Sequence, residues 1–191
     1  FLFSKSNLFD VDMTPHSYQQ SMIELSLENG KLVGIFNEMK TALLTRLKGD
    51  RGQKDTRRSL QYYFVAQDIH ERADSAHIDY QKLVKIFEHS DILFRFQRIL
   101  FIQAKACKDL SHSILHRETY QHNKRFKHAF ANLKLSLEKL RTEQQYDQVW
   151  VNALFSLYQN LKAIDAQLRN VETERHIIFD RTKQIENQLK D

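Results

Sequence analysis

The sequence predicts an all-α protein, an elongated up-and-down bundle of about five long antiparallel helices. Only four glycines and one proline occur in the 191 residues, and all of them lie before residue 53. Leu, Lys, Gln, Glu and Ala, which favour helices, are abundant. Apolar residues recur three and four positions apart, as on one face of a helix. No linker divides the chain, so we expect a single domain over residues 1–191.

The first long helix is expected to begin at Thr14 and Pro15, because Thr caps helices and Pro suits the first helical position. We expect it to end at Gly49. Asn29 is the one polar residue of its apolar seam, a common device for setting register in coiled-coil packing. The seam keeps three-four spacing throughout: Tyr18, Met22, Leu25, Asn29, Leu32, Phe36, Met39 and Leu43.

The second helix is expected to run from about Asp55 to His89. Its seam also keeps helical spacing: Tyr62, Ala66, Ile69, Ala73, Ala76, Tyr80, Leu83 and Phe87. The small side chains of Ala73 and Ala76 would let a neighbouring helix approach closely there.

The third helix is expected to follow Ser90, a plausible N-cap. Apolar residues occupy several of its faces, and Phe94 and Phe101 lie on one of the outer ones. Such a wide apolar surface marks the central helix of the bundle, or one shared with a partner. Cys107, the single cysteine, lies in this helix as an expected buried thiol and cannot form an internal disulfide, which favours a reducing compartment.

A fourth and a fifth helix complete the bundle. The fourth carries an apolar seam of Phe126, Phe130, Leu133, Leu137 and Leu140. The fifth carries another of Trp150, Leu154, Leu157, Leu161, Ile164, Leu168 and Val171. The tail after these residues is amphipathic but has the weakest core pattern.

Composition narrows the classes of partner. Apolar residues make up 41% and charged residues 28% of the chain, which is typical of a soluble protein. The net charge of +5 is spread along the chain without a recognisable reading element, so we expect no nucleic-acid partner. The densest basic segment, residues 46–58, would suit contact with anionic lipid headgroups or be a solvated turn.

Residues 66–77, AQDIHERADSAH, form the candidate site. On an unbroken helix, a polar stripe would lie beside the apolar seam: Gln67, His70, Asp74, His77 and Gln81. Two histidines and a carboxylate at this spacing could bind a metal, although the H-E-x-x-H pattern is absent. They could also sense pH or a ligand. The structural alternative is a polar flank that fastens helices or subunits, with an Asp68–Arg72 pair on the other side.

Other chemistry finds little support in the sequence. It contains no glycine-rich phosphate loop, no nucleophile elbow and no Cys–His pair suggestive of a protease. We therefore expect no catalytic residue, no metal and no cofactor, and the protein is not expected to be an enzyme.

The segments YYFVAQDIHERADSAHIDY (62–80) and HSDILFRFQRILFIQAKAC (89–107) carry a family resemblance. They resemble the soluble domain of YccS-type inner-membrane proteins, in the fusaric-acid-resistance, aromatic-acid-exporter-like group. The resemblance is strongest over QDIHER, the following S-x-H, and HSD-x-LFR-x-QR. These motifs contribute the polar residues Asp68, Glu71, Arg72, Asp91 and Arg95.

The resemblance implies a helical domain between two membrane blocks of the same polypeptide, on the cytoplasmic side of a bacterial inner membrane. Residues 1–13 and 177–191 would then be membrane-proximal connecting segments. The family suggests export of small compounds such as aromatic acids. Five full-length antiparallel helices would place the chain ends at opposite poles, so we expect the tail to fold back.

Two functional hypotheses follow. In the first, the domain is non-catalytic and serves assembly, oligomerisation or gating of an exporter, with a homo-oligomer as one form of that assembly. In the second, it is a ligand- or metal-responsive sensor built on His70, Asp74 and His77.

Overall fold

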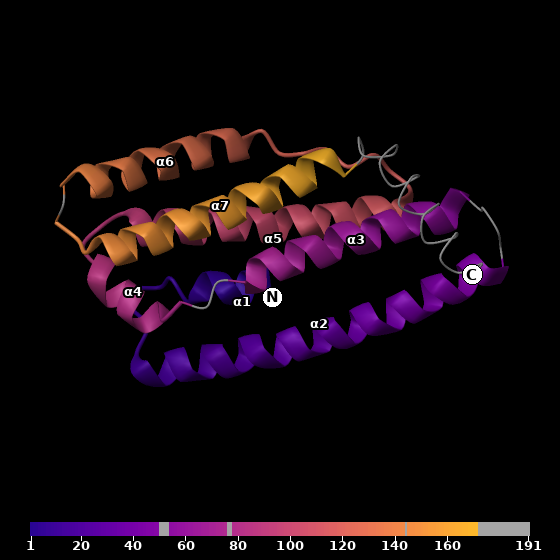
Figure 1. Ribbon diagram of the computed structural model, residues 1–191, viewed down its shortest axis with the longest axis horizontal. Helices are drawn as coiled ribbons and strands as arrows, with labels where there is room; N and C mark the ends of the chain where they lie inside the picture. The colour runs from indigo at the N-terminus through magenta and orange to yellow at the C-terminus, as the bar shows by residue number, and fades with distance from the viewer. Residues whose placement is uncertain (50–53, 76–77, 144, 172–191) are drawn as a thin grey trace.

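The computed structural model describes residues 1–49, 54–75, 78–143 and 145–171, and these residues form helices without a β-strand (Figure 1). The all-α prediction is therefore confirmed. The helices are α1 (Leu2–Asn7), α2 (Pro15–Gly49), α3 (Lys54–Asp74), α4 (Tyr80–Phe87), α5 (Ile92–His116), α6 (Arg125–Glu143) and α7 (Gln148–Asn170). The long helices α2, α3, α5, α6 and α7 alternate in direction along an elongated body (Figure 1). The expected folding back of the tail concerns residues outside the described ones.

Helix α5 is the central helix, as its wide apolar surface predicts. It packs against α1, α4, α6 and α7, and its Phe96 and Ile99 side chains are fully buried. Phe94 and Phe101 remain 62% and 55% exposed, so one apolar face of α5 is not filled by the described residues. In the described part of the chain, no helix combines the length and apolarity needed to span a membrane.

The N-terminal segment forms part of the core, which the sequence did not lead us to expect. Leu8 and Phe9, just after α1, are only 1% and 2% exposed. The Phe9 ring stacks on Phe96 of α5, with centroids 5.6 Å apart, and meets Tyr80 of α4 edge-on at 5.4 Å. Residues 1–9 therefore act as a wedge that joins α4 to α5.

The prediction of one helix from Asp55 to His89 is wrong, because the chain leaves the helix after Asp74 and starts α4 at Tyr80. Asp79 is the N-cap of α4, and its Oδ1 accepts a hydrogen bond from the backbone N–H of Lys82 at 3.1 Å. This bond satisfies one of the N–H groups that a new helix start exposes. The apolar spacing continues across the break, so spacing alone does not reveal it.

The start of α5 also differs from expectation. Asp91, not Ser90, is the N-cap, and its side chain makes no capping hydrogen bond. The Ser90 hydroxyl instead donates to the carbonyl oxygen of Phe87 at 2.8 Å. Ser90 therefore closes the end of α4, where the last carbonyl groups lack helical partners.

Helices α6 and α7 confirm their predicted seams. The apolar seam residues of α6 are all buried, and so are those of α7 from Leu154 to Val171. One polar side chain is fully buried between α5 and α7: the amide nitrogen of Gln103 donates to the carbonyl oxygen of Leu161 at 2.7 Å. The hydrogen bond links the two helices within an otherwise apolar layer.

Helix α2 lies on the outside of the body and packs on α1 and α3 (Figure 1). Near its C-terminal end, Leu43 and Leu47 form a small separate core with Leu60 and Tyr63 of α3. Its remaining seam residues are at most half-buried. Several of its large apolar side chains are exposed: Met22, Ile23, Leu27, Val33, Ile35 and Met39.

The contrast between Phe96 and Phe94 provides a test of the core. We expect Phe96→Ala to lower the free energy of unfolding by about 3–5 kcal/mol, because it leaves a cavity among fully buried residues. Phe94→Ala, two residues away on the same helix, should change the stability of the chain by less than about 0.5 kcal/mol. Urea unfolding followed by circular dichroism measures both. Equal losses would contradict the assigned orientation of α5.

Candidate functional site

The predicted polar stripe is divided by the break after α3. Gln67, His70 and Asp74 lie on α3, whereas Gln81 lies on α4 and lines a separate hollow beside Tyr18. His77 lies outside the described residues. The prediction of this stripe assumed an unbroken helix. Because α3 ends at Asp74, the stripe residues do not lie along one continuous helix face. Among the described residues, no group of three or more His, Cys, Asp or Glu side chains is placed to hold a metal ion.

His70 joins α3 to α2. Its Nε2–H donates to Oδ1 of Asn29 at 2.6 Å, so the one polar residue of the α2 seam meets the histidine of the α3 stripe. The rings of Phe1 and Phe36 pack against the imidazole, with centroids 5.2 and 5.5 Å away. The hydrogen bond therefore lies between aromatic side chains, and it fixes the position of Asn29 on α2 relative to His70 on α3.

Burial lowers the pKa of His70 below its ordinary value, while the nearby Asp74 and Glu71 carboxylates oppose this shift. The neutral imidazole is thus favoured in the folded chain. No hydrogen bond joins His70 to Asp74 among the described contacts, so Asp74 acts on the imidazole only through its charge.

Most of the other polar residues of the QDIHER motif form hydrogen-bonded pairs with side chains one turn away on the same helix. Nε of Arg72 donates to Oδ2 of Asp68 at 2.8 Å, as the sequence predicts for residues one turn apart. The amide nitrogen of Gln67 donates to Glu71 at 2.9 Å. Such partly exposed pairs stabilise a helix by only about 0.3–0.5 kcal/mol.

Asp91 reaches beyond its own helix. Its Oδ2 accepts from the Arg95 guanidinium at 2.6 Å and from the hydroxyl of Ser136 on α6 at 3.3 Å. These hydrogen bonds lower the pKa of the Asp91 carboxyl, against the opposing effect of its partial burial. Asp91 therefore connects the start of α5 to α6.

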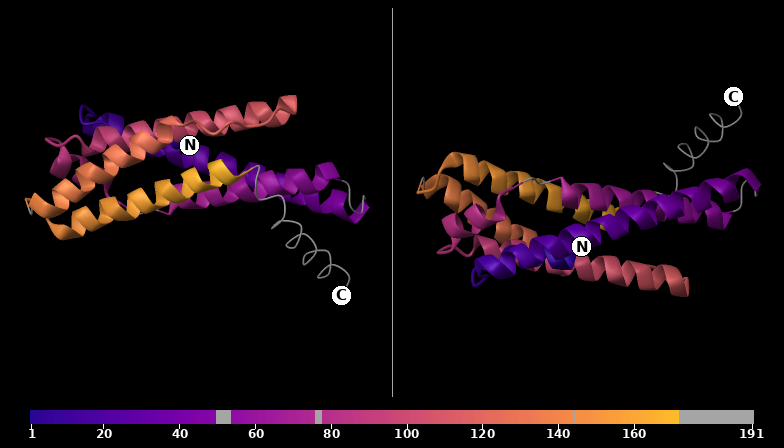
Figure 2. Two further views of the ribbon diagram at one scale, coloured as in Figure 1. Left: turned by 90° about the horizontal axis from the view of Figure 1, so that it is seen from above. Right: turned by 90° about the horizontal axis from the view of Figure 1, so that it is seen from below.

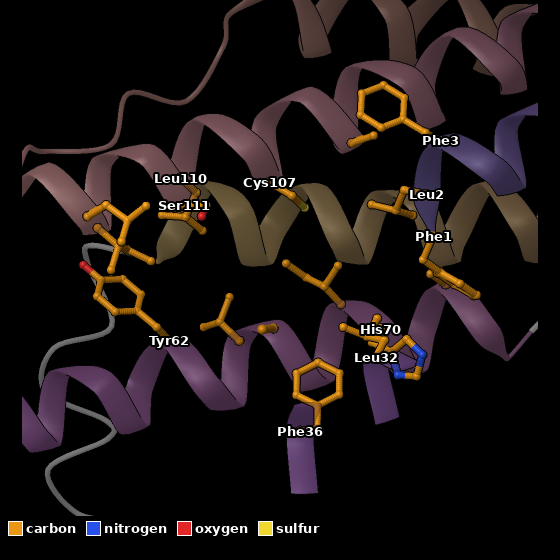
Figure 3. A pocket seen from close by; sticks show the side chains of 17 residues that line it. Phe1, Leu2, Phe3, Leu32, Phe36, Tyr62, His70, Cys107, Leu110 and Ser111 are labelled. Atoms are coloured by element: carbon orange, nitrogen blue, oxygen red, sulfur yellow. The ribbon is translucent and has the colours of Figure 1, made fainter. Parts of the chain in front are cut away.

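An apolar groove of about 420 Å³ lies beside His70, between α3 and the second half of α5 (Figure 3). Figure 2 shows that this half of α5 diverges from α2 and α3. Phe1 and Leu2 close one end of the groove, and Leu32 and Phe36 of α2 reach its edge. Ordinary seam residues form its walls, which is why no local motif in the sequence marks it.

The polar side chains of the groove are neutral. They are the His70 imidazole, the Ser111 and Tyr62 hydroxyls and the Cys107 thiol, whose pKa is raised by burial to about 11. The thiol thus stays protonated and is a poor nucleophile near neutral pH. The groove suits an apolar occupant that makes one or two hydrogen bonds.

Lys5 is a buried charge that sequence reasoning missed. Its ammonium group donates to the carbonyl oxygen of Ala73, in the last turn of α3, and the residue is only 4% exposed. Burial lowers the pKa of Lys5 to about 8, although Asp74 partly opposes the shift. A lysine next to apolar residues in an N-terminal segment gives no sequence signal for this role.

These features define a class of protein, an all-α helical-bundle domain with an apolar groove and incompletely covered apolar helix faces. The model of the FUSC-like family, whose description is "FUSC-like inner membrane protein yccS", matches residues 1–168 of this chain. The chain belongs to this FUSC-like family of inner membrane proteins. The resemblance carried by QDIHER and HSD-x-LFR-x-QR is therefore confirmed.

Two curated relatives support the assignment. The inner membrane protein YccS of Escherichia coli (strain K12) is 49% identical over 175 residues, which cover 92% of this chain and 24% of that protein. An uncharacterized protein of Haemophilus influenzae (strain ATCC 51907 / DSM 11121 / KW20 / Rd) is 36% identical over 171 residues, 90% of this chain and 24% of that protein. The chain thus spans about a quarter of the length of these relatives. No solved structure matches it.

The buried ammonium of Lys5 predicts a stability that depends on pH. The folded chain holds this proton less tightly than the unfolded chain, so the charge destabilises the fold fully below about pH 8. The penalty fades as the pH rises from about 8 towards the ordinary value of 10.5. We expect Lys5→Met to be more stable than the original chain by about 1–3 kcal/mol at neutral pH, because the bond to Ala73 offsets part of the gain.

The measurement is the difference in unfolding free energy between the two chains across that pH range. The difference should shrink as the pH rises. A difference that stays constant would show that Lys5 is not buried as an ammonium group.

Proposed function

We propose that this chain is a non-catalytic domain on the cytoplasmic side of a bacterial inner-membrane exporter, and that it serves assembly of that protein. Its family membership and its share of the relatives' length support a place beside membrane domains of the same polypeptide. Residues 1–13 and 177–191 would connect to those domains. Export of small compounds such as aromatic acids is the transport activity that the family suggests.

The observation that carries the assembly role is the outer face of α2. Gly30 and Gly34 lie one turn apart on this face, and a Cβ atom built on either would meet nothing within 4 Å. Glycine within a helix costs about 0.5–1 kcal/mol relative to alanine, and nothing inside the described chain requires it here. Ile23 and Leu27 continue the same face and are 62% and 61% exposed.

A second copy of this chain is the occupant that we propose for the face. Two helices approach closely where small residues recur four positions apart, and larger apolar side chains pack at the ends of such a contact. A face of this kind is complementary to itself, as the two-fold symmetric contact of a homodimer requires. Pairing of two α2 helices would bury Ile23 and Leu27 and would give the glycines a packing role.

The glycines separate assembly from folding in one experiment. The double variant G30A/G34A should be more stable as a single chain by about 1–2 kcal/mol, because alanine favours the helix and meets no neighbour. The same variant should associate at least about tenfold more weakly, because the added methyl groups hold the two helices apart. Thermal unfolding measures the first effect, and sedimentation equilibrium measures the second.

Ile35→Ala is the matched control. Ile35 is exposed on α2 but follows Gly34 by one residue, so it lies about 100° round the helix. This control should associate as the original chain does. A chain that remains monomeric at high concentration, or a glycine variant that associates normally, would reject the α2 contact.

The groove beside His70 favours a second candidate function, a ligand-responsive sensor. A cavity of about 420 Å³ with apolar walls and a neutral imidazole could hold a small apolar or aromatic compound. Occupation would act on the His70–Asn29 bond and thus on the packing of α2 against α3. A divalent metal bound by His70, Asp74 and His77 is the other form of this hypothesis.

Thermal shift with benzoate, other aromatic acids and Zn²⁺ tests the sensor. A saturable rise in melting temperature is expected, and His70→Ala should abolish it. His89→Ala is the control, because the His89 side chain is 90% exposed and is not among the residues that line the groove. The absence of any shift across these compounds would reject the sensor and leave the α2 contact untouched.

A further inference from the structure

A second large hollow lies between the beginning of α6 and the end of α7, which run side by side in opposite directions (Figure 1). Its volume is about 690 Å³, and the segment His122–Lys124 before α6 closes one side. Five of its lining side chains carry a full positive charge: Lys124, Lys127, Lys134, Lys162 and Arg169. Asp165 is the one carboxylate among the lining residues.

The concentration of positive charge has a clear basis in the sequence. Residues 124–137 contain no Asp or Glu, although the chain as a whole has 24. In the second half of α7, residues 158–170, Asp165 is the single acidic residue. Lys127 and Lys134 are two turns apart on α6, and Lys162 and Arg169 are two turns apart on α7, so each helix presents a basic stripe to the hollow.

Some basic residues elsewhere on the surface are paired with carboxylates. On the same α6 helix, Lys139 lies 3.6 Å from Glu143, and Arg141 lies 2.6 Å from Glu138. By contrast, Lys124, Lys127, Lys134 and Lys162 form no ion pair with a carboxylate of the described residues. Clustered like charges repel one another, so this arrangement destabilises the empty fold and is relieved by a bound anion.

Asp165 fixes the positions of two other side chains that line the hollow. The residue is 1% exposed, and its two carboxylate oxygens accept from Nε2 of His122, at 2.8 Å, and from the Arg169 guanidinium. Because both acceptor oxygens are engaged, Asp165 holds the imidazole and the guanidinium in place. The Arg169 side chain is still 58% exposed and keeps further N–H groups for a ligand.

One wall of the hollow is aromatic. Phe130 and Tyr158 meet edge-on with ring centroids 6.0 Å apart, and both are nearly buried. Burial raises the pKa of Tyr158, with Glu138 adding to the shift, so its hydroxyl stays protonated as a hydrogen-bond donor. The hollow therefore has an aromatic wall and a cationic rim.

We propose that this hollow binds a phosphate-bearing anion, with Lys127, Lys134 and Lys162 as its main cationic contacts. A single carboxylate would leave most of these charges unpaired, whereas a phosphate group offers several acceptor oxygens and up to two negative charges. The phosphate could belong to an anionic lipid headgroup or to a soluble phosphate compound. The site is separate from the α2 face and from the groove beside His70, and it does not depend on the assembly role.

The test uses the 191-residue chain with two kinds of probe. One is pyrophosphate, measured by calorimetry and thermal shift against sodium chloride of equal ionic strength. The other is vesicle flotation with phosphatidylglycerol mixed into phosphatidylcholine, compared with phosphatidylcholine alone. Saturable binding of pyrophosphate would identify a soluble phosphate ligand, and selective binding to the anionic vesicles alone would identify a lipid headgroup.

The decisive comparison is between two variants that remove positive charges, one inside the hollow and one outside it on α6. K127Q/K134Q/K162Q removes three exposed charges from the hollow and should weaken binding at least about tenfold without loss of helicity. K139Q/R141Q removes two paired charges from the same helix α6 and should bind as the original chain does. Equal weakening in both variants, unchanged binding in the triple variant, or no binding of either probe to the original chain would overturn the proposal.

Discussion

The fold depends on how the N-terminal segment packs into the core, chiefly through the buried side chains of Leu8 and Phe9. The buried ammonium group of Lys5 donates to the carbonyl oxygen of Ala73 in the last turn of α3, and this bond offsets part of the cost of burying the charge. Phe9 then lies between Phe96 of α5 and Tyr80 of α4. The short segment therefore contacts both the end of α3 and the start of α4, where the side chain of Asp79 caps the new helix.

The packing around α3 leaves two surfaces open, the apolar groove and the outer face of α2. Phe1 and Leu2 fill one end of the space between α3 and α5, and beyond them α5 diverges and leaves the apolar groove (Figure 2). Helix α2 is joined to α3 by the His70–Asn29 bond near its middle and by the Leu43 cluster near its end. With so narrow a contact, α2 keeps most of its circumference exposed.

Long periodic segments made α2, α5, α6 and α7 predictable, because few residues interrupt their apolar seams. The local Asp68–Arg72 pair was predictable for the same reason, since it depends only on helical spacing. The α3–α4 break was not, because the apolar spacing continues across it and the Lys5 contact beside it comes from about 70 residues earlier in the chain. The candidate stripe was predicted on the assumption of an unbroken helix and was wrong for the same reason. The contact between His122 and Asp165 was missed because the two residues meet only in the tertiary structure.

The open surfaces differ in chemistry and lie on different helices. The exposed face of α2 is apolar and contains glycines, whereas the hollow between α6 and α7 is cationic. Helix α2 packs on α1 and α3, while α6 packs on α5 and α7, so the rest of the bundle separates the two surfaces. The chain can therefore contact a second copy through α2 and bind a phosphate-bearing ligand between α6 and α7 at the same time, because the two surfaces share no residues. A helical domain with this arrangement can join neighbouring copies on one side while it remains charged towards an anionic surface or ligand on the other.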